Sequence, residues 1–131
     1  MHWPDHLLTL DDWIALPEDN SRGYELVAGV LIVSPRPMAK RQDAVWRLAA
    51  QLQPQLPTVW DVVIQAELVI DPSSPSTVRV PDAMAVRREA LERNLPRFDP
   101  GDVLLAVEII AVGSKRTDTV TKFAEYCRGS V

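Results

Sequence analysis

The sequence predicts one α/β domain: a helix, three strands and a second helix, preceded by a short helix and a hairpin. Three observations lead to this fold class. The chain has 131 residues, 47% hydrophobic and 24% charged, which is enough for one buried core. Its 11 prolines divide it into short elements. Some segments carry apolar residues at helical spacing, whereas others are rich in the β-branched residues of strands.

Residues 1–37 are expected to form an N-terminal extension. In "LTLDDWIALPED", Thr9 is placed to cap a helix and Asp12 follows three residues later, a capping-box pattern that predicts a helix to about Leu16. The stretch "YELVAGVLIVSP" predicts a hairpin that turns at Ala28-Gly29, where glycine supplies a positive φ. Glu25 in this hairpin is expected to have a structural use, the alternative being a further acid near the functional site.

Residues 38–131 are expected to form the core. "KRQDAVWRLAAQLQPQL" predicts an amphipathic helix that stops before Pro54. "TVWDVVIQAELVI" and "TVRVPDAMAV" predict two strands paired as an antiparallel hairpin, and "RREALERN" a short helix. Residues 103–110 predict a third strand and residues 116–128 a final helix, together resembling the opening half of a β-α-β crossover without its returning strand.

Composition narrows the functional classes. The net charge of −4 argues against a protein coated in nucleic acid, although a local basic groove stays possible. Cys127 is the single cysteine, which excludes an internal disulfide framework and fits a reducing, cytoplasmic setting. No stretch has the length and apolarity of a membrane span, so no membrane partner is expected. The two histidines lack zinc-ligand spacing.

Two acids occur in apolar segments. Asp82 lies in "VRVPDAMAV" and Glu108 in "LLAVEII". If adjacent strands each point one carboxylate inward, the acids need a cation between them, and hard oxygen ligands favour Mg²⁺ or Mn²⁺. Such an ion could support phosphodiester hydrolysis. The alternative is that Pro-Asp marks a strand end and that Glu108 reaches solvent.

The final predicted helix carries a polar stripe. Asp118, Lys122 and Tyr126 recur every four residues and so share one helix face. Taken alone, the stripe is typical of a solvated ion pair. Because the helix follows the strand with Glu108, it could instead aim Lys122 at the carboxylates, where an ammonium would orient water and offset phosphate charge.

Taken together, "RVPDAMAV", "VLLAVEII" and "GSKRTDTVTKFAEY" resemble the bacterial Uma-two family of predicted endonucleases. This family belongs to the PD-(D/E)XK superfamily, with a restriction-endonuclease-like αβββα core. The resemblance implies that Asp82 and Glu108 bind the metal and act catalytically with Lys122. It also implies a nucleic-acid substrate, with DNA expected. The usual strand lysine is replaced by Ile110, and in this family the lysine is thought to come from the next helix.

Other positions depart from the family pattern. Ala111-Val112 stand where Ser-Pro is usual, and Arg41-Gln42 where His-Gln is usual. Relatives also continue past "YCRGSV", so the final core strand or strands are expected to be missing. The alternative function is therefore a truncated, inactive restriction-endonuclease-like remnant that acts as an oligomerisation or interaction module, with homo-oligomers formed through an uncovered sheet edge.

Basic residues gather near both predicted acids and around the first core helix. Acids such as Asp43, Glu89 and Glu92 dilute these clusters, so solvated faces are the favoured interpretation and phosphate contacts the alternative. The clusters consist of Arg36, Lys40, Arg41 and Arg47; Arg87, Arg88 and Arg93; and Lys115 with Arg116.

Overall fold

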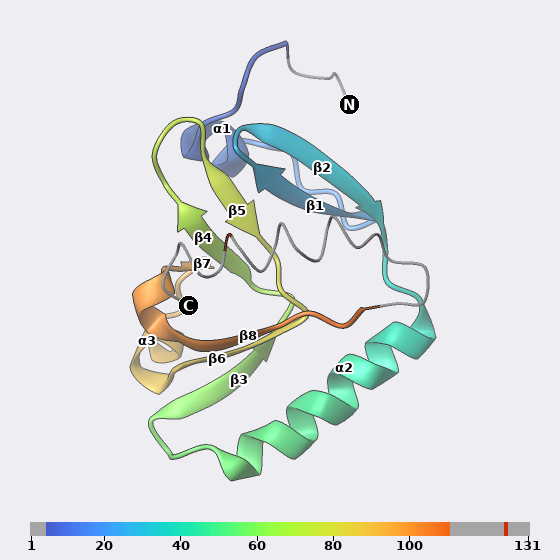
Figure 1. Ribbon diagram of the computed structural model, residues 1–131, viewed down its shortest axis with the longest axis vertical. Coiled ribbons are helices and arrows are strands. Elements are labelled where there is room, and N and C mark those ends of the chain that lie inside the picture. Colours follow the sequence, from blue (N-terminus) through green and yellow to red (C-terminus); the bar gives the residue numbers. More distant parts are fainter. Residues whose placement is uncertain (1–4, 111–124, 126–131) are drawn as a thin grey trace.

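The computed structural model describes residues 5–110 and residue 125. It contains helices and strands in mixed order, which confirms the α/β class (Figure 1). The elements, with η for single turns of 3₁₀-helix, are α1 (Leu10–Ile14), β1 (Arg22–Val27), β2 (Val30–Pro35), α2 (Ala39–Leu52), η1 (Gln53–Gln55), β3 (Trp60–Ile64), β4 (Glu67–Asp71), β5 (Thr77–Arg79), β6 (Ala83–Arg87), α3 (Arg88–Glu92), β7 (Arg97–Phe98), η2 (Pro100–Asp102) and β8 (Val103–Val107).

The N-terminal elements form as predicted. Thr9 accepts a hydrogen bond from the Asp12 backbone amide, and the Asp12 carboxylate accepts one from the Thr9 amide. This reciprocal capping box begins α1, which ends at Ile14, slightly earlier than expected. Between β1 and β2, Ala28 and Gly29 have φ values of 46° and 82°, as in the two-residue turns that match strand twist.

Each of the two long predicted strands is divided in two, which corrects the expectation of continuous strands. "TVWDVVIQAELVI" gives β3 and β4, interrupted at Gln65, whose φ of 52° is incompatible with a strand. "TVRVPDAMAV" gives β5 and β6, interrupted around Pro81, which lacks the amide needed for a strand ladder. The predicted antiparallel pairing of the two segments is confirmed in both halves.

As a result, the long hairpin formed by β3–β4 and β5–β6 contributes strands to two different sheets. Its outer half, β4 and β5, joins the N-terminal hairpin in a five-stranded sheet of order β2-β1-β5-β4-β7. Its inner half, β3 and β6, joins β8 in a three-stranded sheet of order β3-β6-β8. The N-terminal strands β1 and β2 thus belong to the same sheet as part of the predicted core, through the pairing of β1 with β5. Figure 1 shows the two sheets one above the other.

Two apolar clusters stabilise this arrangement. The first joins α1 to the five-stranded sheet and includes Trp13, Leu26 and Val69; the second joins the two sheets and α3 and includes Leu68 and Met84. Leu68 and Val69 are consecutive in β4 and point to opposite faces of the strand, so that one strand contributes to both clusters. Both residues are buried.

Helix α2 packs against β3 of the three-stranded sheet (Figure 1). It ends at Leu52 as expected, and Pro54 is accommodated in the following 3₁₀ turn. The first turn of α2 contains Lys40 and Arg41 and no acidic residue. Basic side chains at the positive end of a helix are unfavourable unless an anion is nearby, so this turn calls for an anionic partner. In residues 5–110 no helix is long and apolar enough to cross a membrane.

Candidate metal centre

Asp82 lies at the junction between the two sheets. It immediately precedes β6, and its side chain is only 9% exposed. Its carbonyl oxygen accepts a hydrogen bond from the Gln65 amide at 3.4 Å, which extends the pairing of β3 with β6 by one residue. Backbone pairing therefore fixes the position of this carboxylate from the β3 side.

Glu108 lies directly after β8, not inside the strand as predicted. The strand ends at Val107, because residues 108–110 leave the ladder. Ala83 of β6 pairs with Val107 of β8, so the same antiparallel register continued by one residue places Glu108 opposite Asp82. The Ile109 amide donates a hydrogen bond to Oδ2 of Asp82 at 2.6 Å. The structure therefore brings the two predicted acids to adjacent positions at the ends of neighbouring strands.

The Asp82 carboxylate also contacts a cation from α2. Arg41 Nη2 lies 2.9 Å from Oδ2, and Arg41 Nε lies 3.4 Å from Oδ1. The Arg41 side chain is 35% exposed, so the pair is open to solvent on the arginine side. Asp82 is thus the anion that the first turn of α2 requires, and the guanidinium offsets the cost of burying the carboxylate.

The sequence patterns point to the two acids but not to this pairing. In the sequence, Arg41 stands out only as a departure from a His-Gln pattern and as one of several basic residues. One signal was available in the sequence: the first turn of the long helix α2 contains two basic residues and no acid. Such a turn is stabilised when another part of the fold places an anion beside it. A contact across 41 residues gives no local pattern from which the partner could be identified.

The donor atoms at this position suit a hard cation. Mg²⁺ typically binds one or two carboxylates and keeps several waters, and Asp82 with Glu108 supplies two carboxylates. Within residues 5–110 and 125 there is no group of three or more His, Cys, Asp or Glu side chains that could hold a metal. The two acids therefore suit a metal ion that is bound mainly through water. For such an ion to bind, Arg41 would have to release at least one oxygen of the Asp82 carboxylate.

Lys122 lies outside the described residues. The same holds for Ala111-Val112 and for the basic pair Lys115-Arg116. Of the predicted final helix, Glu125 is described; it is helical and buried. Its carboxylate contacts Arg79 of β5, three residues before Asp82 in the sequence. The role of Lys122 therefore rests on the resemblance to the Uma-two family.

A buried ion-pair network occupies the strand that leads to Asp82. Arg79 Nε and Nη2 donate to Glu125 at 2.6 and 3.0 Å, and Nη1 donates to Glu25 at 3.2 Å. Glu25 also accepts from the Val80 amide at 2.9 Å. Burial alone would lower the pKa of Arg79, but hydrogen bonds and the charges of both glutamates outweigh it and raise the pKa. Glu25 thus has the structural use expected for it.

Most arginines of the predicted basic clusters are paired with acids. Arg88 makes a two-point contact with Asp61 and thereby lowers the pKa of that carboxyl. Arg87 instead stacks over the ring of Trp60, 5.3 Å from its centroid. Arg47–Asp43 and Arg93–Glu89 are exposed pairs of the kind expected on a solvated face, whereas Arg41 contacts the buried Asp82. The ion pairs are Arg41–Asp82, Arg47–Asp43, Arg88–Asp61 and Arg93–Glu89.

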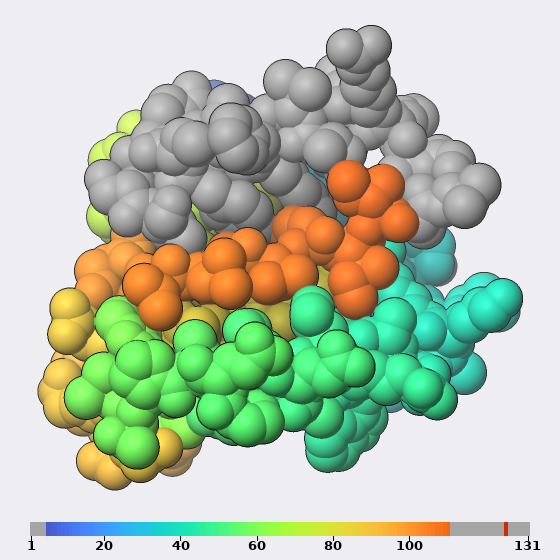
Figure 2. Space-filling model, turned by 60° about the horizontal axis from the view of Figure 1, so that its bottom comes forward, coloured from blue at the N-terminus to red at the C-terminus, as the bar shows by residue number. Residues whose placement is uncertain are grey.

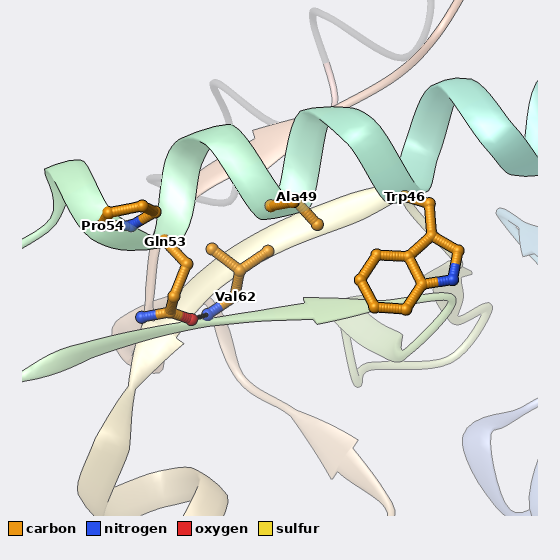
Figure 3. A pocket seen from close by; sticks show the side chains of 6 residues that line it. Trp46, Ala49, Gln53, Pro54 and Val62 are labelled. Atoms are coloured by element: carbon orange, nitrogen blue, oxygen red, sulfur yellow. Dashed lines mark hydrogen bonds between the residues drawn. The ribbon is translucent and has the colours of Figure 1, made fainter.

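An open groove between α2 and β3 has a volume of about 440 Å³. Figure 3 shows Trp46 and Ala49 on the side of the helix that faces Val62 of β3, whose amide donates a hydrogen bond to Gln53 at 2.9 Å. None of the lining side chains is ionisable, so this groove offers no acid or base. The lining residues are Trp46, Ala49, Ala50, Gln53, Pro54 and Val62.

The sequence matches the model of a known protein family. The sequence model of the Uma2 (Uma-two) family, described as "Putative restriction endonuclease", matches residues 10–131. The chain belongs to the Uma2 family. Asp82, Glu108 and Lys122 all lie within the matched Uma2 region.

A solved structure shares the Uma2 chain's fold. It is the crystal structure of a protein from Anabaena variabilis described as "a putative nuclease belonging to DUF820". The TM-score is 0.63 at 17% sequence identity, and the match covers 91% of this chain and 67% of the other. No curated protein matches the sequence. The fold is therefore shared with a protein described as a nuclease.

Proposed function

We propose that this Uma2 protein is a metal-dependent endonuclease that hydrolyses phosphodiester bonds in nucleic acid, with DNA as its substrate. The observation that carries the proposal is the hydrogen bond from the Ile109 amide to Asp82, because it joins the ends of the two strands that carry the acids. Membership of a family described as restriction endonucleases supports the reaction class. The single cysteine fits a cytoplasmic location for such an enzyme.

In this proposal Asp82 and Glu108 hold Mg²⁺ or Mn²⁺ through carboxylate oxygens. When bound, the ion supplies Lewis-acid polarisation of the scissile phosphate and a more acidic water ligand. Lys122 orients the attacking water and offsets negative charge on the phosphate. Arg36 and Lys40 are exposed near the start of α2, the turn that brings Arg41 to Asp82, and they provide positive charge for the substrate backbone.

The test is cleavage of plasmid DNA in the presence of Mg²⁺ or Mn²⁺. We expect Asp82→Ala, Glu108→Ala and Lys122→Ala each to reduce the rate by about 100-fold or more, as is usual when a charge-stabilising group is removed. Asp43→Ala is the matched control, because Asp43 is an exposed acid on α2 that pairs with Arg47. Circular dichroism verifies that the variants fold. Cleavage that survives both Asp82→Ala and Lys122→Ala would contradict the proposal.

The second candidate is an interaction module. Among the described residues, β8 pairs with β6 on one side and forms an edge of the three-stranded sheet. Figure 2 shows the orange stretch that contains β8 as a row of atoms at the surface, and β6 separates this strand from β3 in the sheet. Leu104 and Leu105 are 49% and 40% exposed. An exposed apolar edge strand favours pairing with another chain. Sedimentation that shows a monomer at high protein concentration would argue against this candidate.

A further inference from the structure

The Asp82 carboxylate has a donor on each oxygen. Oδ2 accepts from both the Ile109 amide and Arg41 Nη2, and Oδ1 faces Arg41 Nε at 3.4 Å. The hydrogen bond from the Ile109 amide comes from the backbone next to Glu108, so it helps to hold the two acids close together. The guanidinium, by contrast, covers the same lone pairs that a divalent cation would use.

We propose that Arg41 is a built-in counter-ion of Asp82, which a divalent cation has to displace when it binds. The inference rests on the proposed metal-dependent function and adds a regulatory step to the same site. Without metal, the guanidinium neutralises a carboxylate that is 9% exposed and would otherwise be a costly buried charge. A divalent cation held by Asp82 and Glu108 would supply this neutralisation instead. Metal binding therefore exchanges one positive partner of Asp82 for another.

Arg41 is suited to leave, because it is attached at the surface. Its side chain is 35% exposed, and it belongs to the first turn of α2, which contains no acid that would retain it. The released guanidinium would join Arg36 and Lys40, both exposed at the same end of the helix. This group carries positive charge at a helix N-terminus, where phosphate is the favoured anion. The displaced side chain thus gains a role in holding the nucleic-acid backbone.

The experiment is calorimetric titration of Mn²⁺ into the full chain. We expect Arg41→Gln to bind Mn²⁺ about tenfold or more tightly than the wild type, because a competing cation is gone. Arg41→Lys should be intermediate, since an ammonium makes a point contact where the guanidinium makes two. Arg47→Gln is the matched control and should not change the affinity, because Arg47 is on the same helix and pairs with Asp43.

Thermal unfolding gives a second readout that is independent of cleavage. In the absence of metal, Arg41→Gln should unfold at a lower temperature than the wild type, and Mn²⁺ should raise its Tm by more than that of the wild type. Arg41→Lys retains a positive charge beside Asp82 and provides a folded comparison if Arg41→Gln is too unstable.

The outcomes separate the two proposals. Equal Mn²⁺ affinities of wild type and both Arg41 variants, with plasmid cleavage intact, would overturn the counter-ion role and leave the nuclease proposal standing. Absence of Mn²⁺ binding in the wild type and in both folded Arg41 variants would overturn both. Tighter binding by Arg41→Gln that is lost in the combination with Asp82→Ala would support the exchange at Asp82.

Discussion

Replacement of Arg79 by methionine should cause a large loss of stability. Arg79 is 3% exposed at its side chain and contacts two carboxylates, Glu25 and Glu125, whose side chains are 16% and 6% exposed. Methionine has a similar length but no charge, so the variant would keep both acids in place without this guanidinium. Removal of one partner from a buried ion pair typically costs about 3–5 kcal/mol, because the remaining charge stays desolvated.

The expected change in melting temperature follows from chain length. An unfolding entropy of about 2.1 cal/mol/K per residue gives about 0.28 kcal/mol/K for 131 residues. A loss of about 3–5 kcal/mol therefore corresponds to a fall in Tm of about 11–18 °C. Urea unfolding followed by circular dichroism measures the free energy, and a thermal scan measures Tm. The double variant Arg79→Met, Glu125→Gln should regain part of the loss, since one of the two carboxylates that Arg79 contacts is replaced by a neutral amide.

The chain contains a matched control for this prediction. Arg88 makes the same kind of two-point contact with Asp61, at 2.8 and 3.1 Å, but its side chain is 45% exposed. Arg88→Met should therefore cost much less than Arg79→Met, as is usual for exposed ion pairs. The two substitutions separate burial from contact geometry. A loss for Arg79→Met no larger than the loss for Arg88→Met would refute the reasoning from burial.

Three further predictions concern the N-terminal half. Thr9→Ala removes one half of the capping box and should lower the free energy of unfolding by about 1 kcal/mol in urea titrations; an unchanged midpoint would contradict a stabilising cap. Gly29→Ala should destabilise by more than about 1 kcal/mol, because φ is +82° and the new Cβ would lie 2.8 Å from two neighbouring side-chain carbons; the same unfolding assay measures it. Hydrogen bonds from Ser21 and Tyr24 lower the pKa of Asp19 to about 2, so any stability it contributes is present above pH 3.8 and is lost as pH falls towards 2. NMR titration should show this pKa, and Tyr24→Phe should raise it.

Local patterns in the sequence were sufficient for the N-terminal elements. Thr9 and Asp12 predicted the start of α1, and Ala28-Gly29 predicted the hairpin turn, because in both cases the residues that determine the backbone are within a few positions of one another. The helix that ends before Pro54 was predicted for the same reason.

The division of the long strands was harder to predict. Pro81 in the middle of an apolar run was a usable signal, since proline is rarely found inside a central strand. Gln65 was not, because a glutamine with a positive φ follows no common turn signature and is imposed by the tertiary structure. The position of Glu108 after β8 depends equally on pairing, since the strand ends where its partner strand β6 begins.

At the candidate site, the sequence identified acids by their unusual apolar surroundings. It did not identify what neutralises them, since the Arg41–Asp82 pair joins a helix and a strand junction that are distant along the chain. The neighbours of an acid in the sequence were thus enough to mark it as a candidate functional residue. The cation that neutralises it could be identified only from the three-dimensional fold.

The two consecutive residues of β4 that face different clusters have a consequence for folding. Because Leu68 and Val69 are consecutive, neither side chain can move far without the other. Disruption of one apolar cluster therefore displaces the segment of β4 that also contributes to the second cluster. The hairpin at the N-terminus and the strands that carry the acids should therefore open in one cooperative event. Amide hydrogens of β1 and β6 are then expected to exchange with similar protection, and a stabilising substitution beneath α1 should rigidify the distant acidic junction as well.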